Sequence, residues 1–215
     1  LQSYLDRMTE LLLKENLRDF KNEEVRKVAR IRTLTVLRGL DAPRKALVLL
    51  FLKESELIRP RVAIIDLSGA DFTGANLARA NLPRVNLSNA DLSGADLSRS
   101  NLSGSNLTGV NFSRANLYRT DFTEARLHKA IFTRARLNES DFTEAYLVQS
   151  LFYKAYLRGA DFSAANVSLV NFLEADLTDA EFSGAMLTSS NPSEEQLARA
   201  RTLRGAILPN GKQHD

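Results

Sequence analysis

Large apolar residues return at every fifth position through most of the chain. From Leu67 to Leu187, every fifth residue is Leu, Phe or Val without interruption. The residue two places earlier is small or β-branched, and the residue directly before is mostly Asp or Asn. A strand repeats every two residues and a helix every 3.6, so neither buries such a series on one face. The period of five therefore predicts a repeat architecture.

The repeated unit reads A-[D/N]-[L/F]-[S/T]-X, as in "ADFTGANLARANL" and "ADLSGADLSRSNL". It resembles the pentapeptide repeat proteins, and the resemblance covers about 125 residues without a gap. It implies a mainly β fold, a right-handed quadrilateral β-solenoid in which four units make one coil of twenty residues. The central large residue and the small residue before it would point inward, and the other three positions outward. We therefore expect residues 60–190 to form the solenoid.

The choice between Leu and Phe supports a coil with four sides. At a spacing of twenty residues, one column from Leu77 to Leu177 holds Leu alone. Phe fills most of two other columns, which lie ten residues apart, as Phe132 and Phe142 do. A packing rule with a period of ten fits a square and does not fit a triangle.

Residues 1–59 are expected to cover the N-terminal end of the solenoid as an α-helical bundle. Apolar residues at helical spacing begin at Leu1, and Asn22 is a suitable N-cap for the helix "EEVRKVARIRTLTVLRGL". Asp41 and Pro43 open a third predicted helix, "RKALVLLFLKES". The β-branched segment "PRVAIID", at 60–66, then leads into the first coil.

Residues 191–215 are expected to close the other end as a short helical cap. Ser193 and Gln196 have the spacing of a capping box for a helix over "EEQLARA". The segment "LRGAILPNG" that follows is predicted to fold back over the last coil.

The N-terminal segment "EVRKVARIRTLTVLRGLDAPRKALVLLFL" resembles that of cyanobacterial pentapeptide repeat proteins, many of which place a membrane-spanning stretch just before it. The longest apolar run here, Ala46 to Leu52, is far shorter than a membrane span of about eighteen residues. Because the chain begins inside a predicted helix, we interpret it as part of a longer protein. The residues leave open whether the whole protein is cytoplasmic or membrane-anchored.

Composition and motifs predict no enzyme, cofactor, metal site or small-molecule substrate. The chain has no Cys, which excludes disulfides, thiolate metal ligands and thiol catalysis. Its two histidines, His128 and His214, belong to no catalytic motif, and no phosphate-binding glycine loop is present. The many Asp residues recur with the repeat, so we interpret them as structural.

One stretch departs from Asp or Asn at the position before the central residue. A coil of twenty residues would stack Arg126 under Tyr146, Ile131 under Leu151, and Arg136 under Tyr156, the last as a cation–π pair. Apolar and aromatic side chains beside Arg are typical of interfaces, although scattered apolar surface is also normal. We predict that these six residues form one contiguous protein-binding patch: Arg126, Ile131, Arg136, Tyr146, Leu151 and Tyr156.

The last position of the unit carries a candidate basic flank. Cations stack in two neighbouring columns, one of Arg79, Arg99 and Arg119 and the other of Arg114, Arg134 and Lys154. Such columns attract anions, but they also arise by chance in a charged protein. Basic residues of the second predicted helix, such as Arg30, are interpreted as a solvated face.

The formal net charge of +3 is too small to indicate nucleic acid or an anionic membrane by itself. We therefore predict a non-catalytic protein-binding or scaffolding module whose partner is another protein. The alternative is a modulator of a topoisomerase that mimics DNA, as some pentapeptide repeat proteins do. Such mimicry needs an acidic rod, whereas residues 61–190 hold twelve Lys and Arg against fourteen Asp and Glu, a net of only −2.

Overall fold

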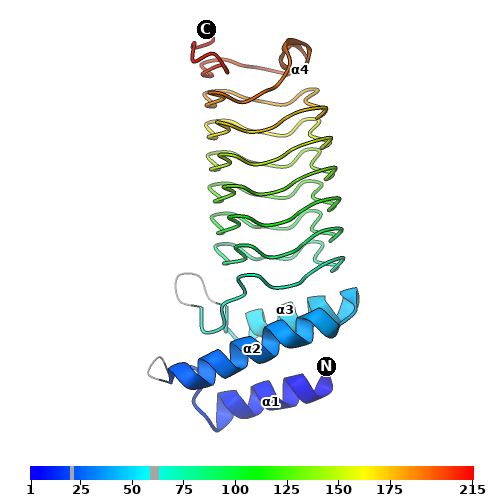
Figure 1. The fold of residues 1–215 in the computed structure, drawn as a ribbon, viewed down its shortest axis with the longest axis vertical. Coiled ribbons are helices and arrows are strands. Elements are labelled where there is room, and N and C mark those ends of the chain that lie inside the picture. Colours follow the sequence, from blue (N-terminus) through cyan, green and yellow to red (C-terminus); the bar gives the residue numbers. More distant parts are fainter. Residues whose placement is uncertain (20–21, 59–62) are drawn as a thin grey trace.

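A computed structural model describes residues 1–19, 22–58 and 63–215. The start of the predicted β-branched segment, residues 60–62, lies outside the described residues. Figure 1 shows a column of stacked coils with helices at its N-terminal end and a short helix at its C-terminal end. The helices are α1 (Gln2–Leu13), α2 (Glu23–Gly39), α3 (Ala42–Glu54) and α4 (Glu194–Ala198).

Each coil contains twenty residues, as the sequence predicts. Parallel bridges join every residue before a central Leu, Phe or Val to the residue twenty places later, from Asp71↔Asp91 to Asn166↔Met186. Within one such rung, the amide of Phe122 donates to the carbonyl of Asp141 at 2.7 Å, and the amide of Asp141 donates to Thr120 at 3.0 Å. The bridges are isolated, so in the described residues the ladder consists of single bridges and contains no extended strand. The predicted coils of twenty residues are therefore present, but in the described residues the ladder contains none of the strands that a mainly β fold implies.

The central residues fill the interior of the coils. Phe132 and Leu137 are fully buried, and so are nearly all their counterparts. Phe rings one coil apart lie parallel, with 4.9 Å between the ring centroids of Phe122 and Phe142. Rings ten residues apart meet edge to face across the core, with 5.9 Å and 88° between Phe132 and Phe142. This contact confirms that Phe occupies two opposite sides, and such pairs are worth about 0.5–1.5 kcal/mol beyond their buried area.

A tight turn forms each corner. The last residue of the unit lies in the left-handed region, with φ of 58° at Arg134 and 67° at Gly74. Glycine adopts this conformation without strain, whereas other residues pay about 1–2 kcal/mol for it. The corners project their side chains outward, and the turn returns the next small residue to the interior.

The three N-terminal helices pack on one another and on the first coil. Met8 and Leu37 are buried in a core that is continuous with that of the solenoid. The hydroxyl groups of Tyr4 and Thr33 lie 2.9 Å apart and join α1 to α2. Asp41 caps α3 as predicted, accepting from the amide of Arg44 at 3.0 Å.

The predicted N-cap of α2 needs a correction. Asn22 occupies the N-cap position, but its side chain makes no capping hydrogen bond. Its Nδ2 instead donates to the carbonyl of Glu15 at 2.9 Å. The amide group therefore tethers the preceding loop, and the acidic residues Glu23 and Glu24 remain to stabilise the first turn of the helix.

The C-terminal cap confirms the predicted capping box. Ser193 Oγ accepts from the amide of Gln196 at 3.1 Å, while Gln196 Oε1 accepts from the amide of Ser193 at 2.7 Å. Gln196 Nε2 also donates to the carbonyls of Phe172 and Ala175, which closes the open end of the coil below. After α4, Thr202 and Ile207 rejoin the ladder through bridges to Glu181 and Met186. The division into 1–59, 60–190 and 191–215 stays a prediction.

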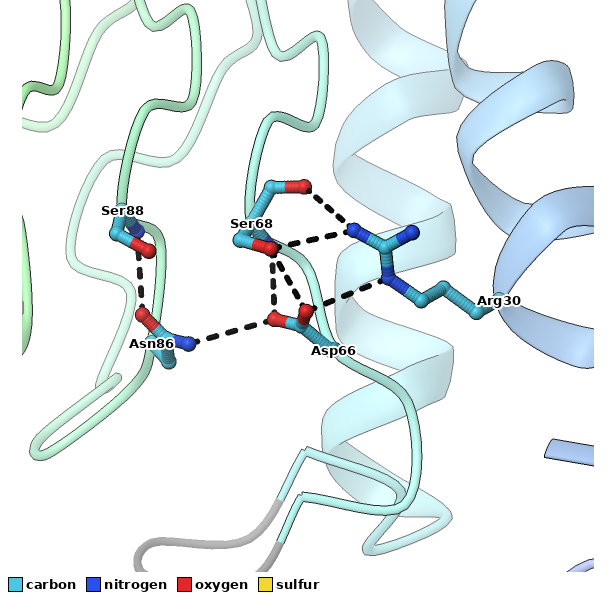
Figure 2. Close-up of polar contacts among 5 residues, drawn as sticks. All are labelled: Arg30, Asp66, Ser68, Asn86 and Ser88. Atoms are coloured by element: carbon cyan, nitrogen blue, oxygen red, sulfur yellow. Dashed lines mark hydrogen bonds and ion pairs between the residues drawn. The ribbon is translucent and has the colours of Figure 1, made fainter. Parts of the chain in front are cut away.

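Polar contacts hold the helices on the solenoid (Figure 2). Arg30 Nε lies 3.3 Å from Asp66 Oδ2, and its Nη2 donates to the carbonyl of Ser68 at 3.2 Å. Asn86, one coil later, donates to the other oxygen of Asp66 at 3.3 Å. Arg30 is therefore half-buried in the junction, which corrects its interpretation as part of a solvated face.

A second ion pair joins α3 to the first full coil. Lys45 is 5% exposed, and its Nζ lies 2.6 Å from Asp71 Oδ1 in the first full coil. Burial acts to raise the pKa of Asp71, but hydrogen bonds from Lys45 and Thr73 outweigh it and lower the pKa. The pKa of Asp66 is likewise lowered, because contacts with Ser68 and Arg30 outweigh its burial.

These shifts predict that acid weakens the junction. A carboxyl whose folded-state pKa lies below its unfolded value of about 3.9 contributes stability above that value, and the contribution is lost as pH falls through the folded pKa. We expect the midpoint of urea unfolding, followed by the helical signal, to fall to lower urea concentration between pH 5 and pH 3. The double variant Asp66→Asn, Asp71→Asn should show a smaller loss over the same range. An unchanged pH dependence in that variant would contradict the assignment.

Candidate protein-binding surfaces

The three predicted stacked pairs form. Bridges join Arg126 to Tyr146, Ile131 to Leu151, and Arg136 to Tyr156. The upper member of each pair is exposed, with 46% of Tyr146, 40% of Leu151 and 53% of Tyr156 accessible to solvent. Arg126 and Arg136 are exposed, while Ile131 is half-buried. The stretch therefore places apolar side chains in the middle of three sides, where most other coils carry Asp or Asn.

The geometry of the coil separates these pairs. Residues five apart lie on adjacent sides, and residues ten apart lie on opposite sides, as the Phe contacts across the core show. Tyr146 and Tyr156 therefore point away from each other. The six residues occupy three sides in place of the single contiguous patch predicted, because stacking at twenty residues aligns coils but does not bring different sides together. Their role in binding stays a prediction.

The predicted cation–π pair of Arg136 and Tyr156 is not among those that the described residues form. Among the described residues, the cations that lie over tyrosine rings are Arg119, 5.0 Å from the centroid of Tyr118, and Lys154, 4.9 Å from that of Tyr153. Both tyrosines occupy the Ser or Thr position of the unit, directly before the corner cation. A tyrosine in place of Ser or Thr is the sequence signal for these contacts, and neither contact was predicted.

The two predicted columns of cations border one side of the solenoid. Arg114 and Arg134 stand at one corner and Arg99 and Arg119 at the next, with Arg136 in the middle of the side between them. We call this surface the basic side; its cations are Arg79, Arg99, Arg114, Arg119, Arg134, Arg136, Lys154 and Arg158. It therefore contains the whole candidate basic flank together with Arg136 and Tyr156 of the candidate patch.

Acids one coil further on neutralise part of the basic side. Ion pairs join Arg119 to Glu139 at 2.6 Å, Lys154 to Glu174 at 3.2 Å, and Arg158 to Asp179 at 3.4 Å. The hydrogen bond from Arg119 lowers the pKa of Glu139. These exposed pairs link neighbouring coils, and each is worth at most about 1 kcal/mol.

Other cations of the basic side have no such partner. In the part of the chain that the structure describes, Arg114, Arg134 and Arg136 form no ion pair with an Asp or Glu. Arg114 and Arg134 stand one coil apart, and two like charges about 5 Å apart in water repel by about 0.8 kcal/mol. Their charge is thus available to an anionic partner, whose binding would relieve the repulsion.

Shallow hollows lie between these side chains. One of about 630 Å³ is lined by Arg114, Asn116, Arg134, Arg136, Asn138, Lys154 and Tyr156. A second, of about 660 Å³, shares Arg114 and Arg134 and extends to Tyr153. Both are open to solvent, so they suit a segment of a macromolecule better than an enclosed small ligand.

The adjacent side is acidic. Its middle column runs through Asp121, Asp141 and Asp161 to Glu181. Each of the three aspartates accepts a hydrogen bond from the amide two residues later, at 2.9, 2.8 and 2.8 Å. These bonds shape the corner that follows, which supports the structural role predicted for the repeated Asp.

In the described ranges, no group of three His, Cys, Asp or Glu side chains is arranged to hold a metal ion. Among the helices described, none combines the length and apolar character needed to cross a bilayer.

Solved structures of pentapeptide repeat proteins are similar to this chain. HetL, involved in heterocyst differentiation regulation in the cyanobacterium Nostoc sp. strain PCC 7120, is 24% identical, with a TM-score of 0.31 over 77% of this chain and 98% of HetL. Rfr23 from the cyanobacterium Cyanothece 51142 is 23% identical, with a TM-score of 0.39 over 63% and 90%. Trypsin-treated QnrB1, a plasmid-mediated fluoroquinolone resistance protein, is 24% identical, with a TM-score of 0.31 over 66% and 79%.

Comparison with curated protein sequences finds no match. The family model of pentapeptide repeats matches in 8 copies, over residues 65–104, 95–134 and 105–143. The family model of a pentapeptide repeat region matches residues 125–202. Together these matches cover residues 65–202, more than half of the chain, and the chain therefore belongs to the pentapeptide repeat family.

Proposed function

We propose that this chain is a non-catalytic module that binds or scaffolds another protein, built on a right-handed quadrilateral solenoid. The observation that carries the proposal is the exposure of Tyr146, Leu151 and Tyr156 in the middle of three sides. At these positions most other coils carry Asp or Asn. The proposal includes no cofactor and no small-molecule substrate, and it specifies no pathway.

The ladder suits this role because it presents side chains from a rigid frame. Tyr146 belongs to a rung in which its amide donates to Ala125 at 2.9 Å and its carbonyl accepts from Leu127 at 2.7 Å. A fixed backbone loses little conformational entropy when a partner binds. Tyrosine adds a large contact area and a hydroxyl group at low entropic cost, as interface anchors do.

The test is a triple variant, Tyr146→Ala, Leu151→Ser and Tyr156→Ala. Because these side chains point outward, we expect the melting temperature to change little and the capture of a partner to fall strongly, each anchor being worth more than about 1 kcal/mol. The measurement is a cross-linked pull-down from the source cells with wild type and variant as bait.

A matched control removes apolar surface elsewhere, with the changes Leu169→Gly, Leu173→Ser and Met186→Ala. These residues are 51%, 52% and 45% exposed. The control should retain the partner that the first variant loses. Equal retention by all three baits, or no specific partner for wild type, would refute the proposal.

The alternative is a DNA-mimicking modulator of a topoisomerase. The acidic ladder from Asp121 to Glu181 is the observation that favours it, and the free cations of Arg114 and Arg134 on the adjacent side oppose it. We expect the purified chain to leave DNA supercoiling by gyrase unchanged. Inhibition that disappears in the double variant Asp141→Asn, Asp161→Asn would establish the alternative instead.

A further inference from the structure

We propose that the basic side binds the acidic face of an α-helix on a partner protein, with the helix lying along the axis of the solenoid. This inference rests on the proposed protein-binding function and specifies the partner's chemistry. It starts from Arg114, Arg134 and Arg136, which form no ion pair among the described residues and line one hollow.

The spacing of the cations favours a helix. Arg114, Arg134 and Lys154 follow one another at the coil spacing of about 4.8 Å along the axis. Acidic residues at i, i+4 and i+7 of a helix advance by about 5.4 Å per turn. From i to i+7 the helix rises by about 10.5 Å, so its mismatch with two coil spacings is about 0.9 Å, which flexible Arg side chains absorb. Alternate residues of an extended strand advance by about 6.8 Å, and the mismatch over the same length is about 4 Å.

The surroundings of the cations favour protein over nucleic acid. The acids Glu139, Glu174 and Asp179 lie at the edges of the basic side, and the column of Asp121 and Asp141 lies on the adjacent side. A nucleic acid carries negative charge all along its backbone, so it would meet these acids as well as the cations. A helix with carboxylates on one face only would face the cations with that face and would meet the acids at the edges with its neutral or basic flanks.

Polar groups in the hollow complete the surface. Asn116, Asn138 and Tyr156 line it beside the arginines and can hydrogen-bond to carboxylates or to backbone carbonyls of the bound helix. The exposed ring of Tyr156 can also cover apolar side chains next to the acidic stripe. Charge thus sets the orientation of the helix, and the tyrosine provides apolar contact.

The corner geometry supplies a variant that leaves the fold intact. Arg114 and Arg134 have φ of 60° and 58°, a conformation that favours glycine. The changes Arg114→Gly and Arg134→Gly therefore remove two charges without adding backbone strain. Arg84 and Lys129 occupy other corners with φ of 57° each. The changes Arg84→Gly and Lys129→Gly make a control with the same net charge and the same kind of backbone.

The probes are fluorescent Ala-rich helical peptides of identical composition. One carries glutamates at i, i+4 and i+7 on a single face, and the other has them spread around the helix. At low salt we expect wild type and the control variant to bind the first peptide at least about tenfold more tightly than Arg114→Gly, Arg134→Gly does, since exposed ion pairs contribute up to about a factor of five each. Binding should weaken as salt rises.

Several outcomes would overturn the inference. They are equal binding of the two peptides, equal loss in the control variant, or tighter binding of a single-stranded oligothymidylate than of the one-faced peptide. If the peptide assay fails while the pull-down still depends on Tyr146, Leu151 and Tyr156, only the acidic-helix inference is wrong. If the pull-down fails while the one-faced peptide binds as expected, the assignment of those three anchors is wrong.

Discussion

Replacing Leu137 with aspartate is expected to disrupt the middle of the solenoid, whereas the same residue at position 138 is expected to be tolerated. Leu137 is fully buried, between Leu117 and Leu157 of its column. The variant loses the burial of a leucine, worth about 2–5 kcal/mol, and places a carboxyl group where no polar partner is available. We expect a loss of at least about 4 kcal/mol in the free energy of unfolding.

Asn138→Asp is the matched control, because it introduces the same side chain one position away. Asn138 points outward, and its Oδ1 accepts from the amide of Arg158 at 3.1 Å. Aspartate keeps that acceptor, so the change should remain within about 0.5 kcal/mol. Urea unfolding followed by circular dichroism measures both variants. Similar unfolding midpoints would show that the inward register is wrong.

Lys45→Ala is expected to loosen the attachment of the helices to the first coil. The variant leaves Asp71 beneath α3 without the ammonium group that now lies 2.6 Å away. The amide of Thr73 still donates to Asp71, and the loss of a hydrogen bond to a charged group costs about 1.5–3 kcal/mol. The loss should appear in the helical signal at 222 nm, because the helices depend on this contact more than the distant coils do.

An exposed pair in the same helix provides the comparison. Arg44 Nη1 lies 3.1 Å from Asp41 Oδ2, with 58% and 53% of the two side chains exposed. Arg44→Ala should therefore cost less than about 1 kcal/mol. Adding Asp71→Asn to Lys45→Ala should recover part of the lost stability, since no charge then remains unpaired. A Lys45→Ala effect no larger than that of Arg44→Ala would contradict the role of the buried pair.

Charge pairing along the rod depended on three-dimensional detail. Arg119 and Glu139 stand in one column of the sequence, as Lys154 and Glu174 do in another, and in the structure each of these acids pairs with the cation one coil before it. Which cations stay unpaired follows from side-chain conformation and from the next coil. A one-dimensional pattern does not contain that information.

The sequence by itself determined which residues face the core, the length of the coil and the placement of Phe on opposite sides. Side-chain direction in a repeat is local, so a period of five identifies the inward positions, and like residues align where coils stack. The tertiary structure decided the rest. It paired Arg119, Lys154 and Arg158 with acids of the next coil, half-buried Arg30 in the junction and buried Lys45 there. These relations depend on how sides and helices meet through long-range packing, and the helices carry no repeat that would predict their orientation on the first coil.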